Sequence, residues 1–199
     1  MASERDAFWA WFSANAARLQ ELARTDASEV ANEVGDQLQQ LGVPLQPEIG
    51  VSPVGPVELV LHTEGNRERF ELARTFVRHA PTLAGWEYTA LRPAMGFELS
   101  LRYQGHELDA KELWFLPLPS AQEPTRLGVR LGLPRYAAEH EDALWTGSMI
   151  LLSSALGEAS AVEDIDSLEV VQLPEQPRTQ GYLPLHELPA TLAQRKRGA

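Results

Sequence analysis

The chain has 199 residues, a formal net charge of −11 and no cysteine, which excludes disulfides, thiolate metal sites, iron–sulfur clusters and cysteine nucleophiles. The negative charge repels phosphate backbones, so we expect no nucleic-acid partner. No run of 18 apolar residues and no signal-peptide hydrophobic region is present, so we expect a cytoplasmic protein that does not enter a membrane.

The first predicted element is an antiparallel pair of helices. Over residues 4–24, large side chains recur at steps of three and four residues, which is typical of a helix with one apolar face. Asp26 is a good N-cap for a second helix over residues 27–41, which Gly42 and Pro44 end. The stripe of the first helix, which leaves out Trp9, consists of Phe8, Trp11, Phe12, Asn15, Leu19 and Leu22.

The next stretch, residues 57–93, reads strand, helix, strand. The strand over residues 57–62 follows a predicted strand over 45–52 after a short loop that contains glycine, so the two are expected to form an antiparallel hairpin. Pro47 places the earlier strand at a sheet edge or at its own start. The helix of residues 66–80 stops at Pro81, and a strand over residues 86–91 follows.

The second half of the chain is rich in alternating strands. Their expected ranges are 96–103, 106–108, 111–119, 126–133 and 167–173. A long helix over 139–156 is apolar almost all round, which predicts deep burial. A short helix over 186–194 is expected before a frayed, solvated tip at residues 195–197.

Together these elements predict the α+β class. A helix hairpin and a long buried helix would pack on one mixed, mainly antiparallel sheet of about six to seven strands. We expect one domain over residues 1–175 and a proline-punctuated tail over residues 176–199.

Catalytic motifs are missing from the sequence. It contains no dinucleotide fingerprint, phosphate-binding loop, nucleophile elbow or zinc-protease pattern. The run Glu139-His140-Glu141-Asp142 places neighbouring side chains in different directions on a helix, which does not suit a metal. We therefore predict no cofactor and no metal.

The strongest hint of chemistry lies at the end of a predicted central strand. His62 precedes a strand-to-helix loop, where α/β sheets place ligands. Glu64 could form an acid–base pair with it, and Arg92, at the end of the third strand, could face an anion. A capping or loop hydrogen bond is the simpler interpretation of His62. An enzyme of unrecognised type would use these three residues.

Acidic residues dominate the segment between Arg135 and Arg178, which holds nine acids and neither lysine nor arginine. The segment is either a solvated surface or a docking surface for a basic protein partner. In the second case the interaction face would comprise Glu163, Asp164, Asp166 and Glu169.

Two motifs stand out in the sequence. The first is Trp11-Phe12-Ser13-Ala14-Asn15, and the second is Ala80-Pro81-Thr82-Leu83-Ala84-Gly85-Trp86 running into Leu91-Arg92-Pro93. They resemble the patterns Trp-Phe-x-x-Asn and Ala-Pro-x-Leu-x-x-Trp of a family of uncharacterised bacterial proteins, a domain of unknown function, and Leu156-Gly157-Glu158 also fits. The resemblance implies a bacterial α+β domain across residues 8–175, and it brings no activity and no catalytic residue.

Three functions are compatible with the sequence. The favoured one is a non-catalytic binding or regulatory module, either monomeric or homodimeric. The alternatives are the enzyme described above and a structural protein that associates with itself through exposed sheet edges near the proline-rich strands.

Overall fold

Two compact units make up the chain, residues 1–93 and residues 94–199. A computed structural model describes residues 2–120 and 123–198, and it has the predicted α+β class. The division differs from the prediction of one domain over residues 1–175 with a tail, because the contacts of residues 176–198 belong to the second unit.

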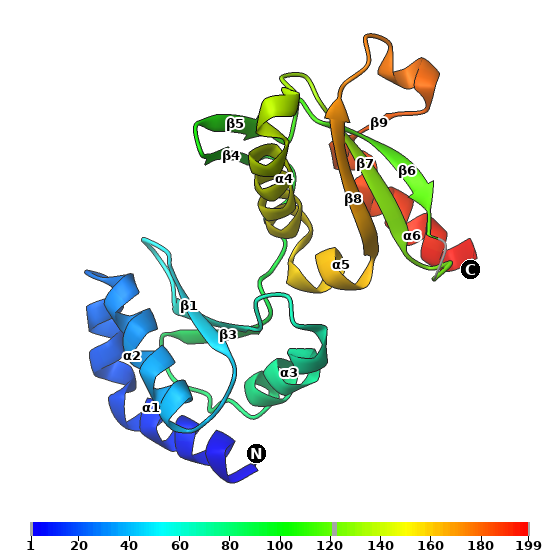
Figure 1. Ribbon diagram of the computed structural model, residues 1–199. Helices are drawn as coiled ribbons and strands as arrows, with labels where there is room; N and C mark the ends of the chain where they lie inside the picture. Colours follow the sequence, from blue (N-terminus) through cyan, green and yellow to red (C-terminus); the bar gives the residue numbers. More distant parts are fainter. Residues whose placement is uncertain (1, 121–122, 199) are drawn as a thin grey trace. The chain divides into compact units, whose positions relative to one another are not determined.

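The first unit begins with the expected helix hairpin. The Asp26 carboxylate accepts a hydrogen bond from the backbone N–H of Glu29 at 2.9 Å, which confirms it as the N-cap of the second helix. Gly42 follows that helix with φ +67°, a conformation that favours glycine. In chain order the elements are α1 (Ala2–Ala23), α2 (Ala27–Gln40), β1 (Gln46–Val51), β2 (Val57–His62), η1 (Arg67–Arg69), α3 (Phe70–Arg78) and β3 (Trp86–Ala90) (Figure 1).

The sheet of this unit has the order β1-β2-β3, so β1 and β3 are its edges. β1 and β2 pair antiparallel, as the predicted hairpin requires, and β2 and β3 pair parallel. All three helices pack on one face, which we call the helix-covered face (Figure 1). On this face Val57, Leu59 and Leu61 are fully buried, and the indole N–H of Trp86 donates to the Ala16 carbonyl at 3.1 Å.

Trp9 and Trp11 exchange the roles that the sequence predicts for them. Trp9 is 5% exposed, and its indole N–H donates to the Phe76 carbonyl of α3 at 3.0 Å. Trp11 is only half-buried. The prediction was wrong because α1 contacts both the sheet and α3, so its buried face is wider than a single stripe.

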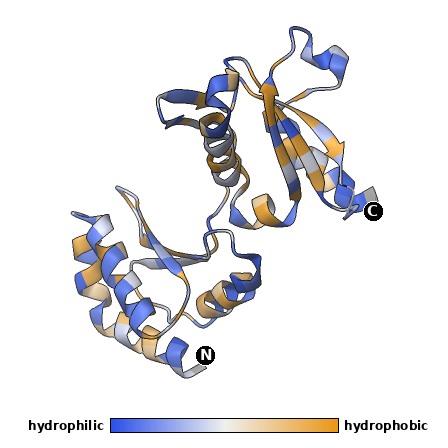
Figure 2. Ribbon diagram, in the orientation of Figure 1, coloured by the Kyte–Doolittle hydropathy of each residue, from blue (hydrophilic) through white to orange (hydrophobic). Residues whose placement is uncertain are grey.

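The second unit contains most of the strands. Hydrophobic residues gather on β6, β7 and β8 (Figure 2). The elements are β4 (Ser100–Tyr103), β5 (His106–Asp109), β6 (Trp114–Pro119), β7 (Leu127–Leu133), η2 (Ala138–His140), α4 (Glu141–Leu156), α5 (Glu158–Glu163), β8 (Ile165–Gln172), η3 (Pro177–Gln180), β9 (Leu183–Pro184), η4 (Leu185–Glu187) and α6 (Leu188–Gly198).

The strands of the described residues form three sheets, whereas the sequence predicts one. β4 and β5 form a separate hairpin, and a four-stranded sheet has the order β8-β7-β6-β9. Alternate residues of β7 point into one core, where Val129 and Leu131 are fully buried. The prediction missed this division because alternation marks a strand without naming its neighbour.

α4 is not buried all round, in contrast to the prediction. Leu144 and Leu151 face the core, but Trp145, Met149 and Ile150 are 43%, 36% and 40% exposed. A helix that is apolar on every side therefore leaves an apolar strip on its surface. Among the described residues, no helix is long and apolar enough to cross a membrane.

The basic end of the chain is the end of helix α6 and not a frayed tip, although Lys196 and Arg197 remain exposed to solvent. Leu188 and Leu192 of α6 belong to the core of the second unit. The ammonium of Lys196 lies 2.7 Å from the Asp164 carboxylate, and Arg195 Nε donates to the Pro124 carbonyl at 2.7 Å. Apolar residues four positions apart thus fasten the helix to its unit, and the two bases extend this attachment.

Candidate functional site

The face of the first sheet opposite the helices carries polar side chains, and we call it the polar face. Side chains alternate across a strand, and residues directly opposite each other in neighbouring strands point to the same side. Since Val57, Leu59 and Leu61 face the helices, the intervening residues of β2 face the other way. From the strand registers, the polar face includes Gln46, Glu48, Glu58, His62 and Thr89.

Arg92 joins two strands of the polar face. Its Nε donates to the Glu48 carboxylate at 2.9 Å, and its Nη2 lies 2.9 Å from His62 Nε2. Arginine only donates, so Nε2 is the acceptor nitrogen of the ring. The backbone N–H of Glu64 lies 3.4 Å from Nδ1. A neutral imidazole has one acceptor nitrogen, and we assign the shorter contact, from Arg92, as the hydrogen bond.

The structure therefore brings together two of the three residues that the sequence singles out. Glu64 is exposed, has φ +56°, and approaches His62 through its backbone; no bond between its carboxylate and His62 is found in the described part of the chain. The carboxylate of the cluster belongs to Glu48, which the sequence analysis missed. The predicted hairpin could have located it, because the observed register places Glu48 opposite Val60 and next to His62.

The chemistry open to this cluster is limited. His62 is 3% exposed and accepts from a permanent cation, so it is poorly placed to take a proton from a bound molecule. The side chains of Arg92 and Glu48 are 47% and 57% exposed, and such surface ion pairs contribute about 0–1 kcal/mol. The arrangement best suits a clamp across the strand ends.

A second feature of this sheet is the free side of β1. The directions of the β2 backbone groups follow from two hydrogen bonds with the β3 side: Leu91 N–H donates to the Leu61 carbonyl at 2.9 Å, and Val57 N–H donates to the Gly85 carbonyl at 2.9 Å. Odd-numbered residues of β2 therefore bond toward β3, and even-numbered residues bond toward β1.

The even-numbered residues of β2 lie opposite even-numbered residues of β1. The backbone groups of Pro47, Ile49 and Val51 consequently point away from the sheet, and we call them the open edge. Pro47 has no N–H, but Ile49 and Val51 each present an N–H and a carbonyl. In residues 2–120 and 123–198, no partner for these groups is found.

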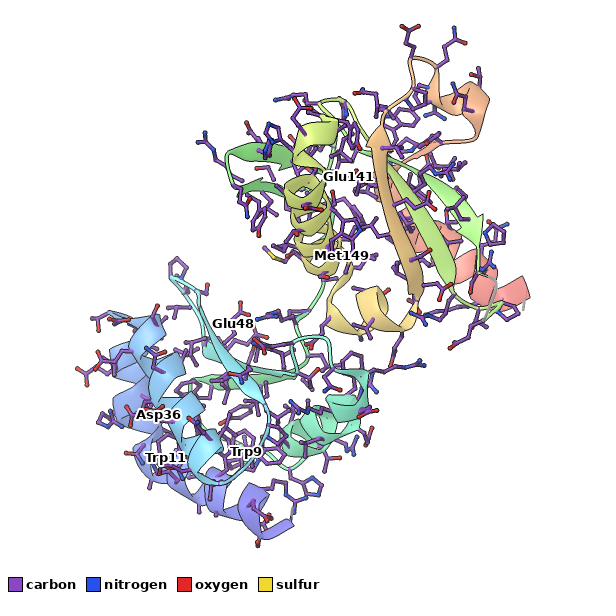
Figure 3. All side chains as sticks on the ribbon, in the orientation of Figure 1. Trp9, Trp11, Asp36, Glu48, Glu141 and Met149 are labelled. Carbon is purple, nitrogen blue, oxygen red and sulfur yellow. The ribbon has the colours of Figure 1, made fainter. Side chains whose placement is uncertain are left out.

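A hollow of about 790 Å³ lies beside the start of β1, and we call it the α2 hollow. α2 lies close to β1 at Gly35, where an added Cβ would lie 3.6 Å from Pro47 Cγ. Asp36 projects from α2, and Glu48 from β1 (Figure 3). The hollow is lined by Ala31, Asn32, Gly35, Asp36, Gln39, Gly42, Val43, Pro44, Leu45, Gln46 and Pro47.

Three of the nine acids in the acidic segment, Asp164, Asp166 and Glu169, pair with bases from other parts of the second unit. Asp164, whose side chain is 8% exposed, pairs with Lys196 and accepts from the Ser160 hydroxyl at 2.6 Å. Two arginines form ion pairs with acids of β8. Arg126, which immediately precedes β7, lies 3.6 Å from Asp166, and Arg130 of β7 lies 2.6 Å from Glu169. The bases lie outside residues 135–178, so the sequence overstates the charge that this segment offers.

Two histidines meet near the start of α4. The rings of His106 and His140 have centroids 4.7 Å apart, and His140 lines a hollow of about 420 Å³ together with Glu139 and Asp142. Within the ranges that the structure describes, no three histidine or carboxylate side chains gather closely enough to hold a metal ion.

Comparison with known proteins finds no family model, no curated protein and no solved structure that matches the chain. The polar face, the open edge and the α2 hollow are therefore the features from which a function can be inferred.

Proposed function

We propose that the protein is a non-catalytic binding module whose first unit captures an extended segment of a partner protein as a fourth strand beside β1. The open edge carries this proposal. Extended peptides add to exposed sheet edges through main-chain hydrogen bonds, and pockets beside the edge then select side chains.

The outward-facing backbone groups of the open edge set how many hydrogen bonds each residue of a bound strand can form. In antiparallel pairing, a partner residue opposite Ile49 would exchange two hydrogen bonds with it, and a residue opposite Val51 would do the same. A residue opposite Pro47 gains one bond only, because Pro47 offers a carbonyl and no N–H. An edge strand of this kind binds a short segment, and its proline limits indiscriminate pairing.

The two alternatives receive less support. The enzyme hypothesis needs an accessible His62, whose side chain is buried and bonded to Arg92. Self-association could use the same open edge, but each copy carries a net charge of −11, which opposes close approach of two copies.

The experiment uses ¹⁵N-labelled full-length chain and synthetic nine-residue peptides in which β-branched residues alternate with polar ones. We expect the amide signals of Ile49 and Val51 to shift on titration and to gain protection from hydrogen exchange. The variant Ile49→Pro removes an outward N–H and leaves the β1–β2 ladder intact, so it should lose binding. The matched control Ile49→Val keeps the N–H and should bind.

Circular dichroism and thermal melting establish whether Ile49→Pro is folded, and Val51→Pro provides a second variant of the same design. Equal binding by folded Ile49→Pro and Ile49→Val would overturn the proposal. So would a dimer whose Ile49 and Val51 amides are already protected without peptide, since the open edge would then belong to a second copy.

A further inference from the structure

We infer that the segment captured by β1 is basic, with a lysine or arginine opposite Pro47 whose side chain enters the α2 hollow and meets Asp36. This inference rests on the proposed strand addition and adds the chemistry of the partner to it. Three observations carry it: the direction of side chains at the open edge, the charge of the hollow, and the polarity of α2.

The direction follows from strand geometry. Residues directly opposite each other in adjacent strands point to the same face of the sheet, whether the strands run parallel or antiparallel. Pro47 lies on the helix-covered face, because it is opposite Leu61 and close to Gly35 of α2. The partner residue opposite Pro47 must therefore direct its side chain toward α2. Gly35 has no side chain to fill the space there.

The lining of the hollow favours a cation. Asp36 is exposed and is the one charged side chain among the described lining residues, and no ion pair of Asp36 is found in the described part of the chain. Asn32 and Gln39 add amide oxygens that can accept hydrogen bonds from an ammonium or guanidinium group. An acidic side chain would meet like charge at Asp36.

The polarity of α2 acts in the same direction. The hollow adjoins the end of this helix at Gln39 and Gly42. The C-terminal end of a helix carries a partial negative charge, which favours nearby cations. The last turn of α2 contains no basic residue of its own. A basic side chain from a partner would supply the positive charge that the C-terminal end of α2 lacks.

The size of the hollow alone does not identify its occupant. A volume of about 790 Å³ lies within the range of about 300–1,000 Å³ that is usual for small-molecule sites, so a free amine would also fit. The position of the hollow beside the open edge favours a side chain, because the bound backbone would hold the cation at the entrance.

The test compares three peptides that differ at one position, where they carry lysine, norleucine or glutamate. Fluorescence anisotropy at low salt measures their affinity for the full chain. An exposed ion pair contributes about 0.2–1 kcal/mol, so we expect the lysine peptide to bind up to about fivefold more tightly than the norleucine peptide. Added salt should reduce this preference, and the glutamate peptide should bind most weakly.

Two variants separate a local effect from a general one. Asp36→Asn should remove the preference for lysine and keep the binding of the norleucine peptide. Glu21→Gln makes the same change of charge at an exposed position of α1 outside the hollow, and it should keep the preference.

The outcomes also distinguish this inference from the proposed function. If the peptides bind, Ile49→Pro abolishes binding, and Asp36→Asn keeps the lysine preference, then the basic partner is wrong and strand capture stands. If no peptide binds at the open edge, both are wrong. If pentylamine binds at Asp36 as tightly as the lysine peptide, and Ile49→Pro leaves both unchanged, the hollow is a site for a free amine and the inference is overturned.

Discussion

Replacing Leu192 by alanine tests whether the C-terminal helix belongs to the core of the second unit. Leu192 is 3% exposed and lies in the same core as Leu188, Val129 and Leu131. The substitution removes buried methyl groups and leaves a cavity that its surroundings fill only in part. If α6 were a solvated tail, the same substitution would cost almost nothing.

The expected cost follows from this burial. Buried leucine-to-alanine changes destabilise proteins by about 2–5 kcal/mol. α6 packs at the margin of its unit and can shift to close part of the cavity, so we expect about 2–3 kcal/mol. For a unit of roughly 100 residues, each kcal/mol lowers the melting temperature by about 4–8 °C, which gives a decrease of about 10–20 °C.

Hydrogen exchange measured by mass spectrometry in increasing urea can assign this loss to one unit. Peptides from β6 and β7 should lose protection at lower urea in Leu192→Ala, while peptides from β2 should be unchanged. Gln194→Ala, at an exposed position of the same helix, is the control and should resemble the wild type. Equal urea midpoints for Leu192→Ala and Gln194→Ala would refute the placement of α6 in the core.

Two further substitutions probe one buried group in each unit. Burial raises the pKa of the Tyr88 hydroxyl from 10.0 to about 12. The unfolded state therefore loses this proton first, and stability that is complete below pH 10 should decline as the pH rises from 10 toward 12. Tyr88→Phe should remove this part of the decline. At pH 7 the variant should be at least as stable as wild type, because the buried Tyr88 hydroxyl makes no hydrogen bond among the described residues. A marked loss of stability in thermal melts at neutral pH would show that the hydroxyl has a hydrogen-bond partner. Lys196→Met leaves the Asp164 carboxylate with the Ser160 hydroxyl, and since Lys196 is 52% exposed we expect a loss of about 1–2 kcal/mol in urea titrations, with Arg197→Met as the exposed control. A loss no greater than that of Arg197→Met would mean that the ion pair contributes little.

Local signals in the sequence predicted most elements and few of their partners. The cap at Asp26, the stop at Gly42 and the antiparallel pairing of β1 with β2 all follow from residues a few positions apart, and all are confirmed. The parallel pairing of β7 with β8 and the contact of β6 with β9 join distant segments. Alternation does not specify such partners, so the sequence predicted neither the division of the strands among three sheets nor the pairing of β9 with β6.

In the candidate site, too, the sequence did not predict contacts that depend on strand register and strand order. The sequence brought His62 and Arg92 together because both end neighbouring strands, and the structure joins them at 2.9 Å. It missed Glu48, whose place depends on the register of a hairpin, and it missed the open edge, which depends on β1 being the last strand of its sheet. Asp164, Asp166 and Glu169 seemed available because their bases lie far away in the sequence, on or just before β7 and on α6.

The strand pairings of the two units also predict the order in which they fold. In the first unit β1 and β2 form a hairpin between residues 46 and 62, and β3 joins them by residue 90. In the second unit β6 must find β9, which joins residue 114 to residue 184. Pairings between distant residues form slowly, because the entropy of closing the long loop is lost before any contact is gained. After dilution from denaturant, β1 should therefore be formed, and its open edge available, while the second unit is still searching for its last strand.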